Sequence, residues 1–551
     1  MNIKIDKFVS HKPSLLGILV FFLVIVDAIA YNLGEDMNWD LQNYHFYNGY
    51  EFLHGTLIKD SLGTVQSYLD PILNSFYYLL IVYLPPVMVT IVIASIQSTS
   101  IAMIFMMARQ LIPYENYKLK LFVPLAIAAA AIFGPIFWSE IGTTMGDTLL
   151  AVPIISAIYL LVFNGGIDER VSGYRKHLIF AGLLIGFSAG LKFTNLVYAV
   201  GVFASMAFTF LLNKGVPRRT IIGDLFIFFL STTAMFIVTY LPVGYTLARH
   251  FGNPIFPYYN NIFKSEYFVK IGFHDMRWFP RTIIQYLDMP FRFMVNQKYP
   301  FGMEISFRIY FFAFIEILIP LYAAKVALGI VRGYKQSWSH IFLVLFFAFS
   351  FIVWEIFFSY YRYIAALELL SPLVLVIILV ELIKPNDFIV GMIGLFVVLC
   401  SMSSFPHSGW GRVRFSSQYF GVTSSQFHSF RNNLIVVGYT PIGFIIPYLP
   451  LSDKIIKVPT TYAFKNDLYS YHFTKPYLKK YFISPLDSWK GSIYFLTRYN
   501  KDLNIAKLNG KKLNPYHLRI HYNKCQEIIT NSFPVAICPA NKISNVARRG
   551  E

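Results

Sequence analysis

The chain contains 551 residues, of which 56% are hydrophobic and only 14% are charged, with a formal net charge of +18. Because about a quarter of the residues in a soluble domain are charged, this composition excludes an ordinary soluble enzyme. Apolar segments close to or above the roughly 17–25 residues that cross a bilayer recur between Leu15 and Phe405. The sequence therefore predicts a polytopic membrane protein. The first segment is too long, and is followed by too many others, to be a cleaved signal peptide.

The apolar segments predict about eleven transmembrane helices and one further helix in the membrane interface. The interfacial segment is 71–84, because its 14 residues are too few to span and it ends at a Pro-Pro pair. Lys and Arg concentrate before the first span and in alternate connections. This predicts a cytoplasmic N-terminus and extracytoplasmic connections at 34–70, 139–147 and 248–305. The predicted spans are 14–33, 86–110, 121–138, 148–164, 178–190, 195–213, 219–247, 306–330, 340–360, 364–383 and 387–405.

We expect a transmembrane domain over residues 1–405 and a basic, extracytoplasmic α/β domain over residues 406–551. The second region carries 20 Lys and Arg against 6 Asp and Glu, so most of the net charge lies there. Within it, 434–449 is apolar enough for a twelfth span, but its two Gly and two Pro favour a strand, a turn and a helix. Cys525 and Cys538 could form a disulfide if this region is extracytoplasmic.

The first extracytoplasmic connection is the leading candidate for chemistry. Its beginning, Gly34–Gly55, places the acids Glu35, Asp36 and Asp40 and two histidines where the chain leaves the bilayer, and such a cluster indicates chemistry at that surface. On a helix, Asp40, Tyr44 and Tyr47 share one face, so the acid would lie on an aromatic platform of the kind that stacks on sugars. The alternative is that Asp40 only caps a helix. The candidates here are Asp36 and Asp40 for catalysis, and Trp39, Tyr44, His45 and Tyr47 for sugar or acceptor binding.

A second acid, Asp147, stands one residue before the fourth predicted span, on the same side as Asp40. Either acid alone would be an ordinary helix cap. Two acids that each enter a helix at one membrane face favour a shared site instead, and we expect them to line one pocket.

Three cations are predicted to lie near that face and could bind a phosphate: Lys192, Arg308 and Arg362. Each also has a structural alternative. Lys192 could extend to the interface or form an ion pair. Arg308 could pair with Glu304, four residues earlier. Arg362 could pair with Glu355 or Glu368, one on each side of it in the sequence.

These features resemble the C-type (GT-C) integral-membrane glycosyltransferases, which include protein O-mannosyltransferases and the aminoarabinose transferase of lipid A. Those families have an acid in the pattern D-E-x-x-Y soon after the first span, then a juxtamembrane helix that begins near a proline. A second acid, in the pattern D-x-x-L, heads their fourth span. This sequence has Asp40 with Tyr44, then Pro71, and then Asp147 with Leu150. It departs from the family at position 41, where Leu replaces the usual Glu.

The stretch from Gly186 to Lys192 also resembles the glycine-rich fifth helix of the family, which ends near a lysine. The resemblance implies an all-α, GT-C-like membrane fold and transfer of a sugar from a polyprenyl-phosphate carrier at the extracytoplasmic face. Asp40 would be the general base, with Asp36 as the second candidate, and Asp147 would help to hold the acceptor or the base. Lys192, Arg308 and Arg362 would contact the donor phosphate.

The sequence leaves two other functions open. A flippase or transporter for lipid-linked sugars would need charges along the bilayer midplane, where Glu316 is the clearest in a sparse set. A polysaccharide ligase also works outside the cell. No recognised metal-ligand spacing is present, although a divalent ion at Asp40 and Asp147 is left open. We expect a bacterial inner membrane location, a glycan or lipid-linked acceptor such as an O-antigen, and no nucleic-acid partner.

Overall fold

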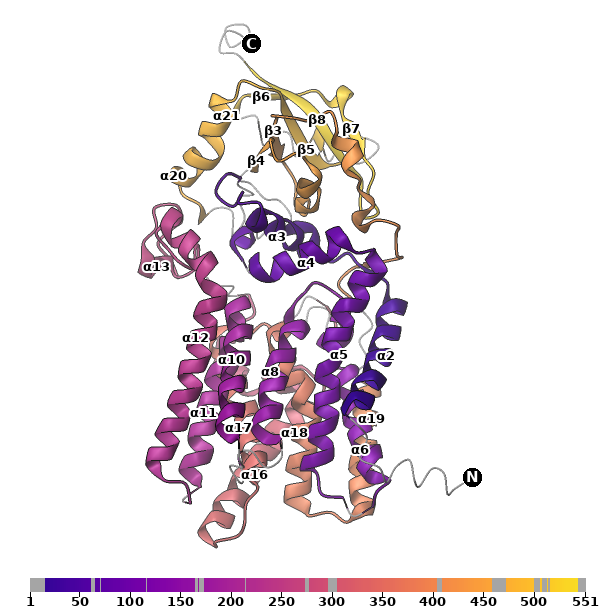
Figure 1. The fold of residues 1–551 in the computed structure, drawn as a ribbon, viewed down its shortest axis with the longest axis vertical. Coiled ribbons are helices and arrows are strands. Elements are labelled where there is room, and N and C mark those ends of the chain that lie inside the picture. Colours follow the sequence, from indigo (N-terminus) through magenta and orange to yellow (C-terminus); the bar gives the residue numbers. More distant parts are fainter. Residues whose placement is uncertain are drawn as a thin grey trace. The chain divides into compact units, whose positions relative to one another are not determined.

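The computed structural model describes residues 15–60, 65–69, 71–114, 116–163, 167, 173–213, 215–272, 277–295, 305–403, 409–457, 472–499, 506–507, 513 and 516–543. The N-terminal Lys4, Lys7 and Lys12 that contribute to the orientation prediction, and Glu304, lie outside these residues. The chain forms two compact units (Figure 1). Unit 1 comprises Met1–Leu33, Thr90–Tyr240 and Asp275–Trp410, and unit 2 comprises Gly34–Val89, Leu241–His274 and Gly411–Glu551.

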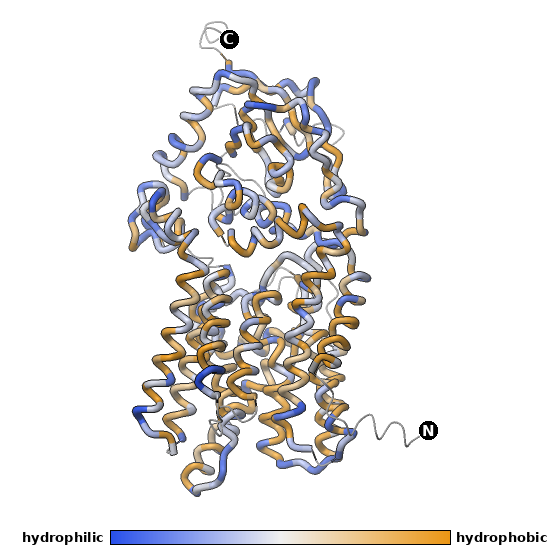
Figure 2. The backbone as a smooth tube through the Cα atoms, viewed as in Figure 1, coloured by the Kyte–Doolittle hydropathy of each residue, from blue (hydrophilic) through white to orange (hydrophobic). Residues whose placement is uncertain are grey.

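Apolar helices build unit 1, and they appear orange along most of their length in Figure 2. Seven of the described helices are long and apolar enough to cross a membrane. They include helical segments Leu16–Leu33, Pro86–Leu111, Phe193–Leu212, Arg218–Phe251, Phe311–Val331, Trp338–Phe357 and Tyr361–Ile383. A polytopic helical membrane protein is therefore confirmed.

The other predicted spans in the transmembrane region coincide with shorter or less apolar helices, so the count of eleven stays a prediction. The predicted spans 121–138, 148–164 and 387–405 correspond to the shorter apolar helices α6, α8 and α19. The segment 178–190 lies within α10. The bounds are α6 (Leu119–Ile132), α8 (Asp147–Val162), α10 (Tyr174–Leu191) and α19 (Asp387–Ser403).

Two buried contacts fix the helices that carry the candidate site. Gly182, Gly186 and Gly190 of α10 lie so close to α12 (Arg218–Phe251) that an added Cβ would overlap Ser231, Thr232 or Thr239. Small residues at every fourth position are what allow two membrane helices to approach this closely. This close packing holds the end of α10 in place.

The second contact joins α18 (Ala365–Ile383) to the short helix α7 (Pro135–Glu140). The carboxylate of Glu368 accepts hydrogen bonds from the backbone N–H groups of Ile136 and Phe137, at 2.9–3.0 Å. It thereby satisfies the donors that the first turn of any helix leaves without an internal partner. Because α18 is the most deeply buried of the long helices, α7 is anchored to the core of unit 1.

Unit 2 contains a six-stranded mixed sheet with the strand order β4-β3-β5-β8-β6, and β7 also pairs with β8. β3 is parallel to both β4 and β5, whereas β5, β6 and β7 are antiparallel to β8. The predicted sheet domain is therefore present. The bounds are β3 (Leu434–Val437), β4 (Lys454–Lys457), β5 (Ile493–Arg498), β6 (Leu518–Ile520), β7 (Gln526–Ile528) and β8 (Val535–Lys542).

The segment 434–449 is not a twelfth membrane helix. Its first four residues form the buried strand β3, and Gly443–Tyr448 form a 3-10 helix. The glycines and prolines between and within these elements end the strand, as the composition favoured.

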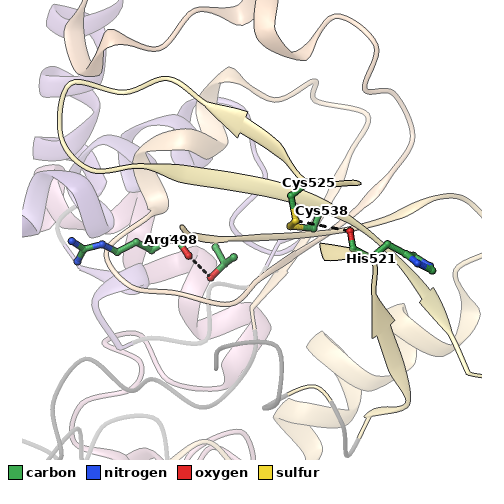
Figure 3. Close-up of a disulfide and its surroundings, with 5 residues drawn as sticks. Arg498, His521, Cys525 and Cys538 are labelled. Atoms are coloured by element: carbon green, nitrogen blue, oxygen red, sulfur yellow. Dashed lines mark hydrogen bonds between the residues drawn. A yellow bond between two sulfur atoms is a disulfide. The ribbon is translucent and has the colours of Figure 1, made fainter. Parts of the chain in front are cut away.

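A disulfide joins Cys525 and Cys538 within the sheet of unit 2 (Figure 3). Cys538 lies in the middle of β8, and Cys525 directly precedes β7. Since β7 is hydrogen-bonded to β8 through the pair Gln526–Ile537, the disulfide closes one end of this strand pair.

The C-terminal residues do not form unit 2 alone, because the first connection packs with them. The two-residue strands β1 (Glu35–Asp36) and β2 (Arg412–Val413) pair in an antiparallel manner. After β1 come α3 (Phe46–Leu53) and α4 (Pro71–Tyr83), which pack so closely that a Cβ on Gly49 would overlap Asn74 of α4. The predicted interfacial segment thus forms α4, which is 13 residues long.

Candidate active site

Asp147 is the first residue of α8, yet its side chain does not cap this helix. The cap position is Gly146, whose φ of 88° is in the left-handed region that glycine adopts readily. The carboxylate instead lies 2.6 Å from Nζ of Lys192 through Oδ1 and 2.9 Å from Nε of Arg362 through Oδ2. The capping alternative for Asp147 is therefore wrong, and its role is that of a shared ion-pair partner. We call Asp147, Lys192 and Arg362 the ion-pair cluster.

Three separate helix ends supply the cluster. Lys192 follows the last residue of α10 in an extended backbone conformation, and Arg362 lies in the 3-10 turn that leads into α18. The hydroxyl of Ser188 donates to the carbonyl of Leu150 at 2.9 Å, which ties the end of α10 to the first turns of α8. Each ion thus stands at the end of a helix whose position is fixed by packing.

All three ions are removed from solvent. The side chains of Asp147, Lys192 and Arg362 are 1%, 10% and 8% exposed. At this depth, breaking one ion pair leaves an unpaired buried charge, which costs about 3–5 kcal/mol. The arrangement also has a charge imbalance, because two cations share one carboxylate.

A fourth ionisable group, Glu140, borders the cluster at the end of α7. Its side chain is fully buried. Burial, and then the negative charge of Asp147, raise the pKa of the Glu140 carboxyl, while Arg362 and Lys192 act in the opposite direction. When Glu140 is protonated, the cluster keeps one positive charge in excess.

Aromatic rings surround the two cations. The Arg362 guanidinium lies 5.3 Å from the ring centres of both Tyr360 and Trp410, and Lys192 Nζ lies 5.3 Å from that of Tyr363. The indole of Trp410 is held by a hydrogen bond to Ser139 at 3.1 Å. Ring faces attract cations without neutralising them, so the excess positive charge remains available to an anion.

The structure brings together three of the residues that the sequence singles out, namely Asp147, Lys192 and Arg362. Arg362 pairs with Asp147 and not with Glu368, whose carboxylate is occupied by α7. The guanidinium of Arg308 donates to the hydroxyl of Tyr310 at 3.3 Å, and its contact with a donor phosphate stays a prediction.

The first connection belongs to unit 2, and its acids have different environments. Asp36 is buried in β1 and its carboxylate accepts hydrogen bonds from the backbone and side chain of Asn38, at 2.8–3.0 Å. Glu35 accepts from the backbone and hydroxyl of Ser416 at 2.9 and 2.8 Å. Asp36 thereby holds a residue only two positions away, whereas Glu35 joins the first connection to a distant part of the sequence within unit 2. Asp36 also lies in the strand β1 and not on a helical turn before Asp40.

Of these three acids, Asp40 alone is not fully buried. It directly precedes a π-helical turn (Leu41–His45) that continues into α3, and its side chain does not cap this turn. The wider π turn rotates successive side chains by a smaller angle than an α-helix, so the helical spacing expected for Asp40, Tyr44 and Tyr47 is not kept.

The aromatic residues beside Asp40 are less open than a sugar platform requires. Trp39 is half-buried, whereas Tyr44 and His45 are buried and meet edge to face with ring centres 4.4 Å apart. Tyr47 is fully buried. Trp39 is therefore the best placed of the four predicted sugar-binding residues to meet a ligand. Asp40 and Asp147 belong to different units, so the distance between them stays a prediction.

Within the described ranges, no group of three or more His, Cys, Asp or Glu side chains could hold a metal ion. A divalent ion at Asp40 and Asp147 stays a hypothesis.

Sequence reasoning missed Glu140 and Gln97, both of which border the cluster. Glu140 had a usable signal, because it is a second acid in the same short connection as Asp147. Gln97 is a polar residue in the middle of a long apolar helix, which also marks a position where a buried partner is expected.

Comparison with known proteins gives structural similarities but no sequence match. No family model matches, and no curated protein matches. The chain is similar in structure to ArnT from Cupriavidus metallidurans bound to undecaprenyl phosphate, with 11% identity and a TM-score of 0.46 over 96% of this chain and 98% of ArnT. The same protein in the apo state gives 11% identity and a TM-score of 0.46 over 95% and 98%.

Proposed function

We propose that the chain is a membrane glycosyltransferase that moves a sugar from a polyprenyl-phosphate-linked donor to a glycan, lipid-linked polysaccharide or O-antigen acceptor. The observation that carries this proposal is the buried pair Lys192 and Arg362, which share the single carboxylate of Asp147. A buried site with excess positive charge suits a phosphate group. Arginine is well matched to phosphate because its planar fork donates two parallel hydrogen bonds.

The reaction uses the cluster at the leaving group. The acceptor hydroxyl attacks the anomeric carbon, a new glycosidic bond forms, and the bond from that carbon to the phosphate oxygen breaks. The departing lipid phosphate gains negative charge, which Lys192 and Arg362 stabilise more strongly in the transition state than in the donor. Asp40 accepts the proton that the attacking hydroxyl loses. The lipid then leaves as polyprenyl phosphate.

Asp147 acts through the cations in this scheme. Both oxygens of its carboxylate face a cation, so Asp147 is less suited to act as a base than Asp40. It holds Lys192 and Arg362 at fixed positions before the donor arrives, which avoids the cost of reorganising them during the reaction.

We place the reaction at the extracytoplasmic face of a bacterial inner membrane. This assignment rests on the alternation of Lys and Arg among the connections and on the resemblance of the Asp40 and Asp147 motifs to GT-C enzymes. Residues 1–405 would form the catalytic domain, and the basic region 406–551 would attract a phosphate-rich glycolipid or membrane surface.

The direct test is covalent transfer by the purified chain in detergent micelles. The chain is mixed with undecaprenyl-phosphate sugars of several kinds and with a membrane glycolipid extract, and the release of undecaprenyl phosphate and the labelled product are measured. A flippase gives no covalent product in micelles, since it has no bilayer to act across. Absence of both product and lipid release with every donor would contradict the proposal.

The same assay tests the cation pair. Lys192→Met and Arg362→Met should each lower turnover by about 100-fold or more, the size of effect seen when one electrostatic stabiliser is removed from an enzyme. Lys325→Met is the matched control, because Lys325 pairs with Glu381 in the same unit, outside the cluster. It should leave turnover near the wild-type value.

A further inference from the structure

Glu140 does for α8 what a capping residue normally does. Its Oε2 accepts hydrogen bonds from the backbone N–H and the hydroxyl of Thr148, both at 3.0 Å. The N–H groups in the first turn of a helix have no internal partner, and a side-chain oxygen usually satisfies one of them from the adjacent cap position. Here the oxygen comes from the end of α7, and the residue between Gly146 and Thr148 is Asp147 itself.

Gln97 of α5 (Pro86–Leu111) closes this arrangement from the other side. Its amide nitrogen donates to the carbonyl of Glu140 at 3.1 Å and to the hydroxyl of Thr148 at 2.7 Å. Its amide oxygen accepts from the N–H of Gly142 at 2.8 Å. Gln97, Glu140 and Thr148 are all fully buried, so the connection between α7 and α8 is held at both of its ends.

The hydrogen-bond directions show which property of Glu140 matters. Because the hydroxyl of Thr148 receives a hydrogen from Gln97, its own hydrogen points to Oε2 of Glu140. That oxygen accepts two hydrogen bonds and needs no negative charge to do so. The other oxygen, Oε1, is buried without a hydrogen-bond partner in the described part of the chain, and such burial costs a charged carboxylate more than a neutral carboxyl.

We propose that Glu140 is a positioning residue, which holds the first turn of α8 through the acceptor atom Oε2 so that Asp147 can fix Lys192 and Arg362 for the donor phosphate. Its role in binding the donor rests on the proposed function, whereas its role in forming the ion pairs does not. The two ion pairs depend on separations of 2.6 and 2.9 Å. A displacement of the turn by about 1 Å would weaken both, and such a misplacement can cost about 100-fold in rate.

The test compares Glu140→Gln, which keeps an acceptor oxygen and loses the charge, with Glu140→Leu, which loses the acceptor. Two quantities are measured on the full chain in micelles. One is the dissociation constant for undecaprenyl phosphate. The other is the rate at which an amine-reactive reagent labels Lys192, followed by peptide mass spectrometry, because a lysine released from its ion pair reacts faster.

We expect Glu140→Gln to stay within about threefold of the wild type in both measurements. Glu140→Leu should raise the dissociation constant at least about tenfold and increase the labelling of Lys192 several-fold. Rescue by Gln separates positioning through the acceptor from a role of the charge. Ser337→Ala is the control for the loss of a helix cap, because Ser337 caps α17 (Trp338–Phe357), away from the cluster. It should lower only the thermal stability.

Three outcomes overturn the proposal: wild-type labelling of Lys192 in Glu140→Leu, labelling in Glu140→Gln as fast as in Glu140→Leu, or an equal effect of Ser337→Ala. If Glu140→Leu fails to fold, Thr148→Val replaces it, because this variant loses the hydroxyl contact and keeps the backbone one. It should increase labelling by a smaller factor, and unchanged labelling would overturn the proposal. If the wild type does not bind undecaprenyl phosphate, the proposed function fails while the labelling still tests the role of Glu140.

Discussion

Nζ of Lys192 lies 2.6 Å from Oδ1 of Asp147, although the two residues are 45 positions apart and belong to different helices. The second oxygen of the same carboxylate faces Arg362 at 2.9 Å. Both of the carboxylate's oxygens are therefore engaged by cations, and the three side chains form one electrostatic unit. The effects of substitutions within the ion-pair cluster on stability and on turnover should therefore not be additive.

Asp147→Asn should impair transfer strongly and lower stability. The substitution leaves Lys192 and Arg362 buried without a counter-charge, which costs about 3–5 kcal/mol of the free energy of unfolding. Turnover and the thermal unfolding midpoint of the purified variant measure the two effects.

The double variant Asp147→Asn, Lys192→Met separates the effect on turnover from the effect on stability. It removes one charge of each sign, so it should recover much of the lost stability without recovering turnover. Loss of stability alone in Asp147→Asn, with normal turnover of the folded fraction, would show that Asp147 is only structural.

Asp40→Asn should abolish transfer and leave the fold intact. The substitution keeps the shape of the side chain and removes the group that accepts the proton, and general-base catalysis is worth about 100- to 10,000-fold in rate. Turnover of the purified variant is compared with its thermal unfolding midpoint.

Asp36→Asn is the matched control four residues earlier. Its carboxylate accepts hydrogen bonds from the backbone and side chain of Asn38, so this variant should lose stability and keep turnover in the folded fraction. Near-normal turnover of Asp40→Asn would remove Asp40 as the base, and loss of turnover in Asp36→Asn without a loss of stability would move the assignment to Asp36.

Much of unit 1 could be predicted because it depends on local patterns. Hydropathy locates the helices, and the glycine repeat before Lys192 predicts close packing. Asp147, Lys192 and Arg362 each stand at the end of an apolar helix, and the alternation of charged connections assigns those ends to one side. Because these three helix ends lie on one side, the three side chains can meet once the helices pack together.

The other features of the fold and of the candidate site depend on tertiary contacts, which leave no periodic pattern in the sequence. The capping of α8 by Glu140 depends on how α7 approaches it, and the sequence marks Glu140 only as a second acid in the same connection and not as a cap. The pairing of Glu35–Asp36 with Arg412–Val413 involves two residues on each side, which is too short for a period of two to be visible. Tyr47 is buried after a π turn that begins directly after Asp40, and sequence periodicity does not reveal this turn.

Cys525 and Cys538 should be joined in protein prepared without reductant. Disulfides persist in extracytoplasmic compartments, so this result also tests the predicted side of the sheet. Peptide mass spectrometry after blocking free thiols measures the fraction of each cysteine that is oxidised. Cys400 is the internal reference, because it is buried and not part of a disulfide. Two free thiols at 525 and 538 would remove the disulfide and weaken the proposed topology.

The stability of the sheet should depend on pH through Asp60. Burial raises the pKa of its carboxyl from 3.8 to about 6, although the N–H of Ile455 donates to Oδ1 at 3.0 Å and Lys454 and Lys59 are nearby. Between pH 4 and pH 6 the folded state therefore binds more protons than the unfolded state. The free energy of unfolding should fall as the pH rises through this range, by about 3 kcal/mol in total.

Asp60→Asn should remove this dependence, because the neutral amide keeps an acceptor for Ile455 and cannot ionise. The variant should match the wild type near pH 4 and exceed it in stability near pH 7. Hydrogen exchange of the β4 peptide, corrected for the intrinsic effect of pH, measures this locally and avoids the assumption that the whole chain unfolds in one step. Asp487→Asn, at an exposed position of the same unit, should leave the exchange unchanged. Equal protection of wild type and Asp60→Asn at pH 7 would mean that Asp60 is ionised without cost, because Lys454 and Lys59 would then offset its burial in full.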